Sequence, residues 1–205
     1  VNRGSVDKIF INTSGIGVVR DQWDIAGKNA RVGDTVLVSG TVGDHGVTVL
    51  SMREGLAFEA PIQSDSAPLN GLVADMMAAS NRIRAMRDPT RGGLVTTLNE
   101  IALQSNVGIE LMEDQIPVRD GVEGACELLG LDPLYLANEG KLIAFVDPAE
   151  AEAVLEAMRQ NRYGREAAVI GTVVADNPGK VFMKTAIGGT RILDMLAGEQ
   201  LPRIC

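Results

Sequence analysis

A glycine-rich loop is the first stretch of the sequence whose residue types suggest chemistry. Residues 40–46 read Gly-Thr-Val-Gly-Asp-His-Gly and lie between a predicted strand and a predicted helix. Exposed backbone N–H groups of such a loop at a helix start favour an anion, commonly phosphate. The loop lacks the Gly-Lys-Ser/Thr ending of a P-loop, so an ordinary strand-to-helix turn stays open as the alternative. The candidate phosphate contacts are Gly43, Asp44, His45 and Gly46.

A second candidate phosphate site precedes another predicted helix. Residues 86–93 read Met-Arg-Asp-Pro-Thr-Arg-Gly-Gly, which places guanidinium groups, a hydroxyl and glycines at the helix start. A carboxylate beside a bound phosphate can also hold a divalent cation, and Asp88 is in place for this. The alternative is an elaborate N-cap with solvated arginines. The candidate residues are Asp88, Thr90, Arg91, Gly92 and Gly93.

A carboxylate lies in a third stretch, immediately before a predicted buried strand. Residues 137–141 read Ala-Asn-Glu-Gly-Lys. At the edge of a sheet and beside a glycine, Glu139 is well placed to act as a general base or as a Mg²⁺ ligand. The alternative is an ordinary exposed turn, which is the more common explanation for such a run of residues.

The chain ends in a thiol, Cys205. Chain ends are usually mobile, and packing gives no reason for a cysteine there. A mobile thiol can move between sites and carry an acyl-type group as a thioester or thiocarbamate. The alternative is a chance terminal residue. The other cysteine, Cys126, falls in an apolar helical stretch and is predicted to lie in the core.

Composition excludes several classes of protein. The 205 residues carry 27 acidic and 19 basic side chains, a net charge of −8, which argues against nucleic-acid and membrane-surface binding. Aromatic residues make up only 3%, too few for a base-stacking platform. Two cysteines and one histidine cannot form a four-ligand zinc site. This cysteine usage, with no apolar run of about 18 residues and no signal-peptide pattern, predicts a cytoplasmic protein.

Apolar periodicity predicts an α+β fold, with a mixed sheet flanked by helices. Residues 83–91 are predicted to be irregular because Pro89 ends regular structure. Asn-Pro-Gly at 177–179 predicts the turn of a hairpin, and 147–150 predict an N-cap, an N1 proline and a capping-box glutamate. The predicted strands are 9–14, 35–39, 107–111, 141–146, 167–174 and 180–184, and the predicted helices are 47–54, 68–79, 92–105, 120–129, 151–158 and 193–197.

Taken together, several segments resemble the HypE family of hydrogenase maturation factors, which are carbamoyl dehydratases. That family belongs to the ATP-binding superfamily of aminoimidazole ribonucleotide synthetase and selenophosphate synthetase. The resemblance spans essentially the whole chain, and Asp-Pro-Thr-Arg-Gly-Gly and the Pro-Arg-Ile-Cys end are its family-specific parts. It implies the fold of the superfamily's C-terminal domain. The segments that carry it are 1–13, 43–46, 86–93, 138–141 and 202–205.

The resemblance also implies a division of the chain. Residues 1–20 match the last strand of an N-terminal ATP-binding domain that is otherwise missing, which agrees with a first residue other than Met. Residues 21–197 correspond to the C-terminal α+β domain, and 198–205 correspond to a flexible tail that ends in the carrier cysteine. A homodimer is expected for the full-length protein.

For activity, the resemblance implies ATP-dependent dehydration of a carbamoyl group on the Cys205 thiol. A HypF-type carbamoyltransferase would load this thiol, and Glu139 would serve as the base or as a metal-linked carboxylate. ATP, with Mg²⁺, would turn the amide oxygen into a phosphate leaving group, and the two glycine-containing segments would bind its phosphates. The thiocyanate product would donate cyanide to iron on a HypC–HypD-type scaffold. No nucleic-acid or membrane partner is expected.

Two other functions fit the same residues. A synthetase or kinase of this superfamily that acts on a free small molecule has no need of Cys205, so deleting the tail would leave its activity unchanged. A non-catalytic docking module would bind a partner through the tail, and Glu139→Gln would then affect binding alone.

Overall fold

The computed structural model describes residues 14–19, 23–56 and 62–195 of the chain. The strands in these ranges are β1 (Thr35–Val38), β2 (Ile83–Arg87), β3 (Gly108–Met112), β4 (Ile143–Val146), β5 (Ala168–Val174), β6 (Val181–Lys184) and β7 (Thr190–Ile192). The α-helices are α1 (Asp44–Glu54), α2 (Asn70–Ala79), α3 (Gly93–Ser105), α4 (Asp120–Leu129) and α5 (Ala151–Gln160). Short 3₁₀ helices are η1 (Gly27–Asn29), η2 (Glu113–Gln115) and η3 (Pro133–Tyr135).

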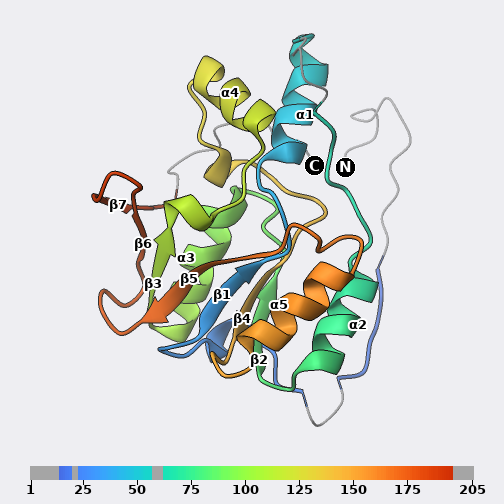
Figure 1. Cartoon of the computed structure of the whole chain (residues 1–205), viewed down its shortest axis with the longest axis vertical. Helices are drawn as coiled ribbons and strands as arrows, with labels where there is room; N and C mark the ends of the chain where they lie inside the picture. Colours follow the sequence, from blue (N-terminus) through green and yellow to red (C-terminus); the bar gives the residue numbers. More distant parts are fainter. Residues whose placement is uncertain (1–13, 20–22, 57–61, 196–205) are drawn as a thin grey trace, which may run out of the picture.

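The strands form one mixed sheet flanked by helices, which confirms the predicted fold class (Figure 1). Within the described ranges the sheet has seven strands in the order β2-β4-β1-β5-β3-β6-β7. Neighbouring strands are antiparallel except β3 and β6, which are parallel. No helix in this part of the chain is long and apolar enough to span a bilayer.

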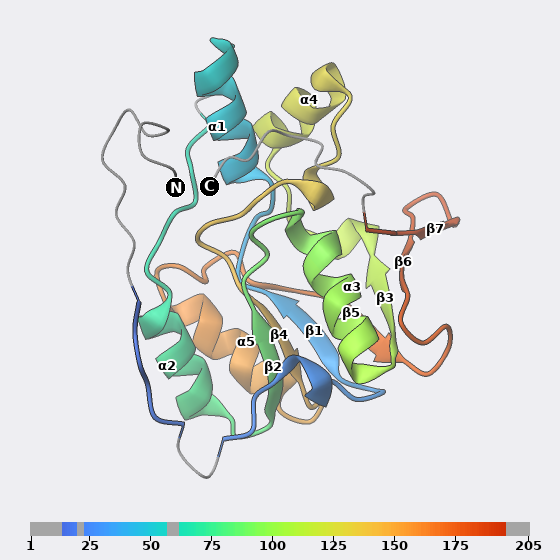
Figure 2. The same cartoon turned by 180° about the vertical axis from the view of Figure 1, so that it is seen from behind.

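Strand β1 shows how the sheet builds two apolar layers, because successive residues of a strand face opposite sides. Val36 and Val38 lie in the core that contains α3, whereas Leu37 lies in the core that contains α2 and α5. Figures 1 and 2 show α2 and α5 together on one face of the sheet and α3 on the other. The central strands are therefore covered on both faces.

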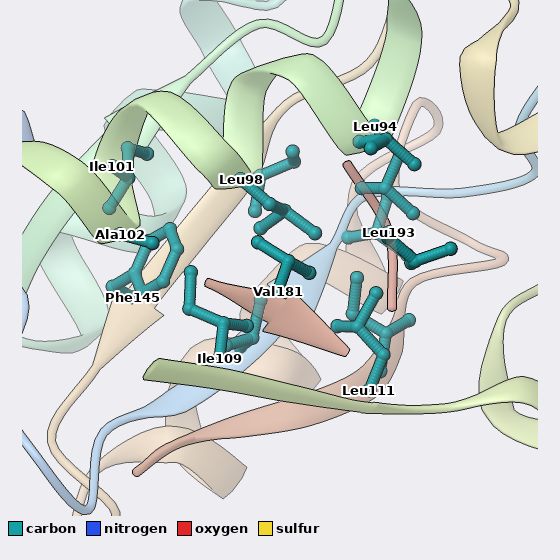
Figure 3. Packing of buried hydrophobic residues seen from close by; sticks show 14 of the residues in the cluster. Leu94, Leu98, Ile101, Ala102, Ile109, Leu111, Phe145, Val181 and Leu193 are labelled. Carbon is teal, nitrogen blue, oxygen red and sulfur yellow. The ribbon is translucent and has the colours of Figure 1, made fainter. Parts of the chain in front are cut away.

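The larger core lies between α3 and the sheet (Figure 3). Leu94, Leu98 and Ile101 recur every three or four residues, so they line one side of the helix. Each is at most 1% exposed, and burial of a large aliphatic side chain contributes about 1.5–3 kcal/mol. Their partners in this cluster include Ile109, Leu111, Phe145, Val181 and Leu193.

Helices α1 and α4 pack on each other beyond the end of the sheet (Figure 1). Val47 of α1 belongs to the same buried cluster as Val122 and Cys126 of α4. Cys126 is 2% exposed, which confirms it as a core residue, and burial raises the pKa of its thiol to about 11. Gly55 and Gly130 end the two helices in the left-handed region.

The predicted hairpin of the last two long strands is wrong. β3 lies between β5 and β6 and pairs with both, antiparallel to β5 and parallel to β6. The turn itself does form, with Asn177 at φ 52° and Gly179 at φ 77°. It carries the chain across β3 because the Gly179 N–H donates to Val107 O at 2.8 Å, just before β3 begins.

Two local predictions are also wrong. The segment predicted to be irregular contains β2, whose alternate residues Ile83 and Ala85 are buried, and Pro89 lies beyond the strand end. The N-cap predicted at 147–150 is not used, because α5 begins at Ala151 without a side-chain cap. Asp147 instead accepts hydrogen bonds from the Ala149 N–H and from a β2 arginine.

The predicted elements at the two ends of the chain lie only partly within the described residues. The helix predicted over 193–197 is absent from its described part, 193–195. Leu193 continues from β7, with its side chain buried and its N–H donating to Val181 O at 2.9 Å. The predicted strand 9–14 lies outside the described residues except for Ser14, which has no regular structure.

An ion-paired arginine ties β2 to two neighbouring segments. Arg84 Nε lies 2.9 Å from Asp34 Oδ1, and Arg84 Nη2 lies 2.8 Å from Asp147 Oδ2. The Asp34 side chain is only 2% exposed. Since a buried carboxylate needs a counter-charge, Arg84 holds the chain before β1 and the chain after β4 against β2.

Arg84→Met is expected to lower the free energy of unfolding by about 3–5 kcal/mol, because it leaves the buried Asp34 without a cation. Arg82→Met is the matched control, since Arg82 is 54% exposed and lies 3.7 Å from Asp147. The control substitution should lower the free energy of unfolding by less than about 1 kcal/mol. Urea unfolding of both variants measures the difference, and equal losses would contradict the role of Arg84.

Candidate functional site

The side chain of Asn138 joins the three internal segments that the sequence singles out. Its Oδ1 accepts the Gly43 N–H at 2.8 Å, and its Nδ2 donates to Pro89 O at 3.1 Å and to Leu136 O at 3.0 Å. Its own backbone N–H also donates to Pro89 O, at 3.1 Å. Asn138 is fully buried. The loops after β1 and β2 and the loop before β4 are therefore fixed against one another.

Two glycines allow the first loop to approach its neighbours closely. A Cβ at Gly43, where φ is 88°, would lie 2.9 Å from Val122 Cγ1. A Cβ at Gly46 would lie 2.8 Å from Leu136 Cβ, and the Gly46 N–H donates to Ala137 O at 3.1 Å. Both amides thus donate within the protein, and both glycines are required for packing.

A third close approach occurs at the start of α3. Gly92 is its N-cap with φ 69°, and Gly93 has φ 64°. A Cβ at Gly93 would lie 2.6 Å from the carbonyl oxygens of both Leu134 and Leu136. Only a glycine fits this contact, which places the start of α3 directly against the segment that leads to Asn138.

Helix α1 begins three residues earlier than the sequence predicts, so Asp44, His45 and Gly46 lie in its first turn. Asp44 is buried, and Thr41 Oγ1 donates a hydrogen bond to its carboxylate. Arg119 Nε lies 3.4 Å from Asp44 Oδ1, an oxygen that accepts no hydrogen bond within the described residues. Arg119 also donates to Thr41 Oγ1 at 3.2 Å.

Burial raises the pKa of the Asp44 carboxyl, and the Thr41 hydrogen bond and the Arg119 charge oppose this shift only in part. The protein therefore keeps a carboxylate where solvation is poor. Buried acids of this kind concentrate at functional sites. The sequence analysis did not identify Arg119. A single exposed arginine before a helix gives no sign that it contacts Thr41 and Asp44, which lie 78 and 75 positions earlier in the chain.

His45 lies beside a segment that the sequence does not highlight. Its Nδ1 is 2.9 Å from Ser64 Oγ. Its Nε2 is buried and has no hydrogen-bond partner in the described part of the chain. The imidazole thus retains one free nitrogen at the first turn of α1, where a donor can meet an anion.

Glu139 lines a polar cavity of about 440 Å³ together with Thr90 and Arg91, so the structure brings three predicted site residues together. Its Oε1 is buried and accepts no hydrogen bond from the described residues. Arg87, at the end of β2, pairs with Glu100 of α3 at 2.9 Å on the same cavity wall. The other lining residues are Thr96 and Thr97.

Asp65 holds the backbone around Glu139 and was missed by the sequence prediction. Its Oδ1 accepts the Glu139 N–H at 3.0 Å, and its Oδ2 lies 3.3 Å from Lys141 Nζ. The Asp65 and Lys141 side chains are 2% and 11% exposed. No local signal points to Asp65, which stands between two serines in a segment without a recognisable motif.

Other predicted site residues are not brought into the cavity. Asp88 is exposed and does not line it, although its backbone oxygen accepts a hydrogen bond from Thr97 at 3.4 Å. Cys205 lies outside the described residues. Among the residues that are described, no three His, Cys, Asp or Glu side chains gather as a metal site.

Comparisons with known proteins find several that are similar to this chain. The family model described as AIR synthase related protein, C-terminal domain, matches residues 31–184. The chain is 60% identical over 205 residues to carbamoyl dehydratase HypE of Azotobacter vinelandii. It covers 60% of that curated relative, and the relative covers 100% of this chain.

Two solved structures are also similar. The crystal structure of hydrogenase maturation protein HypE in complex with ATP has a TM-score of 0.84 at 51% identity, over 88% of this chain and 55% of that one. The crystal structure of a HypE–HypF complex has a TM-score of 0.81 at 46% identity, over 84% of this chain and 56% of that one.

Asn138→Ala is expected to lower the free energy of unfolding by about 2–4 kcal/mol, because each buried backbone group left without a partner costs about 1–3 kcal/mol. Hydrogen exchange at the Gly43 amide should accelerate in the variant. Asn29→Ala is the control, since Asn29 donates at 2.8 Å to Asp24 O in an exposed hydrogen bond. An unchanged Gly43 exchange rate would show that Asn138 does not hold this loop.

Asp44→Asn is expected to stabilise the protein at pH 7. Since the folded-state pKa of Asp44 is raised above 3.8, the folded chain binds the proton more tightly than the unfolded chain, and stability falls as pH rises through that range. Asparagine does not titrate, so the advantage of the variant should disappear below pH 3.8. Urea unfolding across this range tests the sign; a gain that persists in acid would contradict it.

Proposed function

The chain belongs to the family of AIR synthase related proteins, and on this premise we propose that it forms part of an ATP-dependent carbamoyl dehydratase. The proposed role is in maturation of nickel–iron hydrogenases, where the enzyme supplies cyanide for the iron centre. Sequence identity to HypE proteins over the whole chain supports this activity. The polar cavity with the bare carboxylate oxygen of Glu139 is the structural observation that carries it.

The proposed substrate is a carbamoyl group on the Cys205 thiol, Cys–S–C(=O)–NH₂. Dehydration breaks the carbon–oxygen bond and both N–H bonds and leaves Cys–S–C≡N. ATP, when bound, supplies the phosphoryl group with which the oxygen leaves as phosphate. The protein must therefore hold the amide and remove two protons from its nitrogen.

Glu139 is the proposed base for these protons. A carboxylate oxygen that other groups of the described chain leave free can accept a proton from a substrate that lies beside it. Glu139 has such an oxygen, and its backbone is held by Asp65 and by the buried neighbour Asn138. Its position in the cavity would therefore be reproducible from one turnover to the next.

The proposed nucleotide contacts occupy both loops that Asn138 joins. Thr90 and Arg91 offer a hydroxyl and a guanidinium to phosphate in the cavity, and His45 offers a free ring nitrogen. The glycines contribute by allowing these loops to pack closely against neighbouring segments, where a side chain would clash. The full set proposed to bind the nucleotide or to shape its site is Gly43, Asp44, His45, Gly46, Asp88, Thr90, Arg91, Gly92 and Gly93.

Mg²⁺ is proposed to arrive with the nucleotide. This ion usually keeps several waters and binds through one or two carboxylates plus phosphate oxygens. The absence of a three-ligand cluster among the described residues fits such a shared site, to which Asp88 would contribute one carboxylate.

The partners proposed are those that the chemistry requires. A HypF-type carbamoyltransferase loads Cys205, and a complex of the relative HypE with HypF supports this pairing. A HypC–HypD-type scaffold presents the iron that accepts cyanide. The homodimer of the full-length protein and the cytoplasmic location stay predictions.

Intact mass after incubation with ATP, carbamoyl phosphate and the carbamoyltransferase tests the proposal. A carbamoyl adduct adds about 43 Da and its dehydrated form about 25 Da to a nucleophilic thiol. Both should appear in the full-length protein and disappear in Cys205→Ala. A Cys205→Ala variant that still accepts the label would contradict the carrier role.

Glu139→Gln should keep the adduct of about 43 Da and slow its dehydration at least about 100-fold, because amide nitrogen cannot replace the base. Glu152→Gln is the control, since Glu152 is exposed on α5, which covers a face of the sheet. An unchanged yield of thiocyanate in Glu139→Gln would remove Glu139 from the mechanism.

A further inference from the structure

We propose that Asp65 is a positioning residue of the dehydration site, which holds Glu139 in place and keeps Lys141 away from it. The inference rests on the proposed function, because it assigns Asp65 a role in presenting the base. Asp65 belongs to the described segment 62–69, which has no regular structure before α2 begins.

Both carboxylate oxygens of Asp65 face the loop that carries Glu139. Oδ1 accepts the Glu139 N–H at 3.0 Å across 74 residues of sequence, and Oδ2 lies 3.3 Å from Lys141 Nζ. The side chain is 2% exposed, so its charge is removed from water. A carboxylate in such a place is retained at a cost in desolvation, and its two partners are the backbone N–H of Glu139 and the ammonium group of Lys141.

Steric contact at Gly140 fixes the same arrangement. A Cβ at Gly140 would lie 1.7 Å from Asp65 O and 2.8 Å from the Ala67 N. The backbones of the two segments are therefore in direct contact, with no room for a side chain between them. The hydrogen bond and the ion pair of Asp65 therefore act between two segments whose backbones already touch.

The ion pair has a consequence for the base itself. Lys141 is two residues from Glu139, and its ammonium lies beside Asp65 rather than bonded to Glu139 Oε1, which accepts no hydrogen bond from the described part of the chain. An ammonium that moved onto Glu139 would stabilise its ionised form and weaken it as a proton acceptor. Asp65 thus leaves the Glu139 oxygen available to the substrate.

Two substitutions separate the parts of this role. Asp65→Asn keeps an acceptor for the Glu139 N–H and removes the charge that holds Lys141, whereas Asp65→Ala removes both. The loading of Cys205 should be unchanged in each. The dehydration rate should fall about tenfold in Asp65→Asn and about 100-fold in Asp65→Ala, while the KM for ATP changes less than about twofold. Ser66→Ala, an exposed neighbour, is the control.

A second readout does not depend on activity. Hydrogen exchange at the Glu139 amide should be faster in Asp65→Ala than in the wild type or in Asp65→Asn, and thermal unfolding checks that each variant is folded. Unchanged exchange in Asp65→Ala, or unchanged dehydration in both variants when the wild type is active, would overturn the positioning role. If Cys205 of the wild-type protein is loaded with the carbamoyl group but this group is never dehydrated, the proposed function is overturned, and this inference with it.

Discussion

Three loops from distant parts of the chain are held together by one buried carboxamide, that of Asn138. A carboxamide has an acceptor and two donors in fixed directions, and here they satisfy one N–H and two carbonyl groups of the backbone. An aliphatic side chain of the same size would leave the Gly43 N–H and the Leu136 carbonyl without this partner, and Pro89 O would keep only the backbone N–H of Asn138. The geometry of the cavity follows from this contact, because Glu139 and the start of α3 lie on the segments it joins.

Local patterns in the sequence predict much of the fold but not how its strands pair. The apolar stripes of α3 and α4 and the glycine that ends α4 are visible in single windows, and both helices form within a residue of their predicted bounds. Pairing depends on residues far apart, so β3 between β5 and β6 could not be foreseen. β2 was missed because its arginines and Met86 mask the alternation of Ile83 and Ala85.

The candidate site, too, was predicted where its residues stand in local motifs and was missed where they depend on distant contacts. Thr90, Arg91 and Glu139 stand in motifs with glycines and charges side by side, and these three do meet at one cavity. Asp65 and Arg119 act through contacts with residues more than 70 positions away, and each has ordinary neighbours in the sequence. The buried carboxylates have different partners: Asp34 pairs with Arg84 of the sheet, Asp44 lies near Arg119, and Asp65 pairs with Lys141 beside the Glu139 loop.

The long separations of these contacts bear on how the protein folds. Asn138 reaches Gly43 across 95 residues, and Leu142 reaches Ser39 across 103. Because closing such large loops costs more chain entropy than forming a local helix, we expect these contacts to form after the local helices. A chain whose sheet is incomplete therefore has no assembled cavity. A group that binds in the cavity would therefore meet only molecules whose sheet is complete.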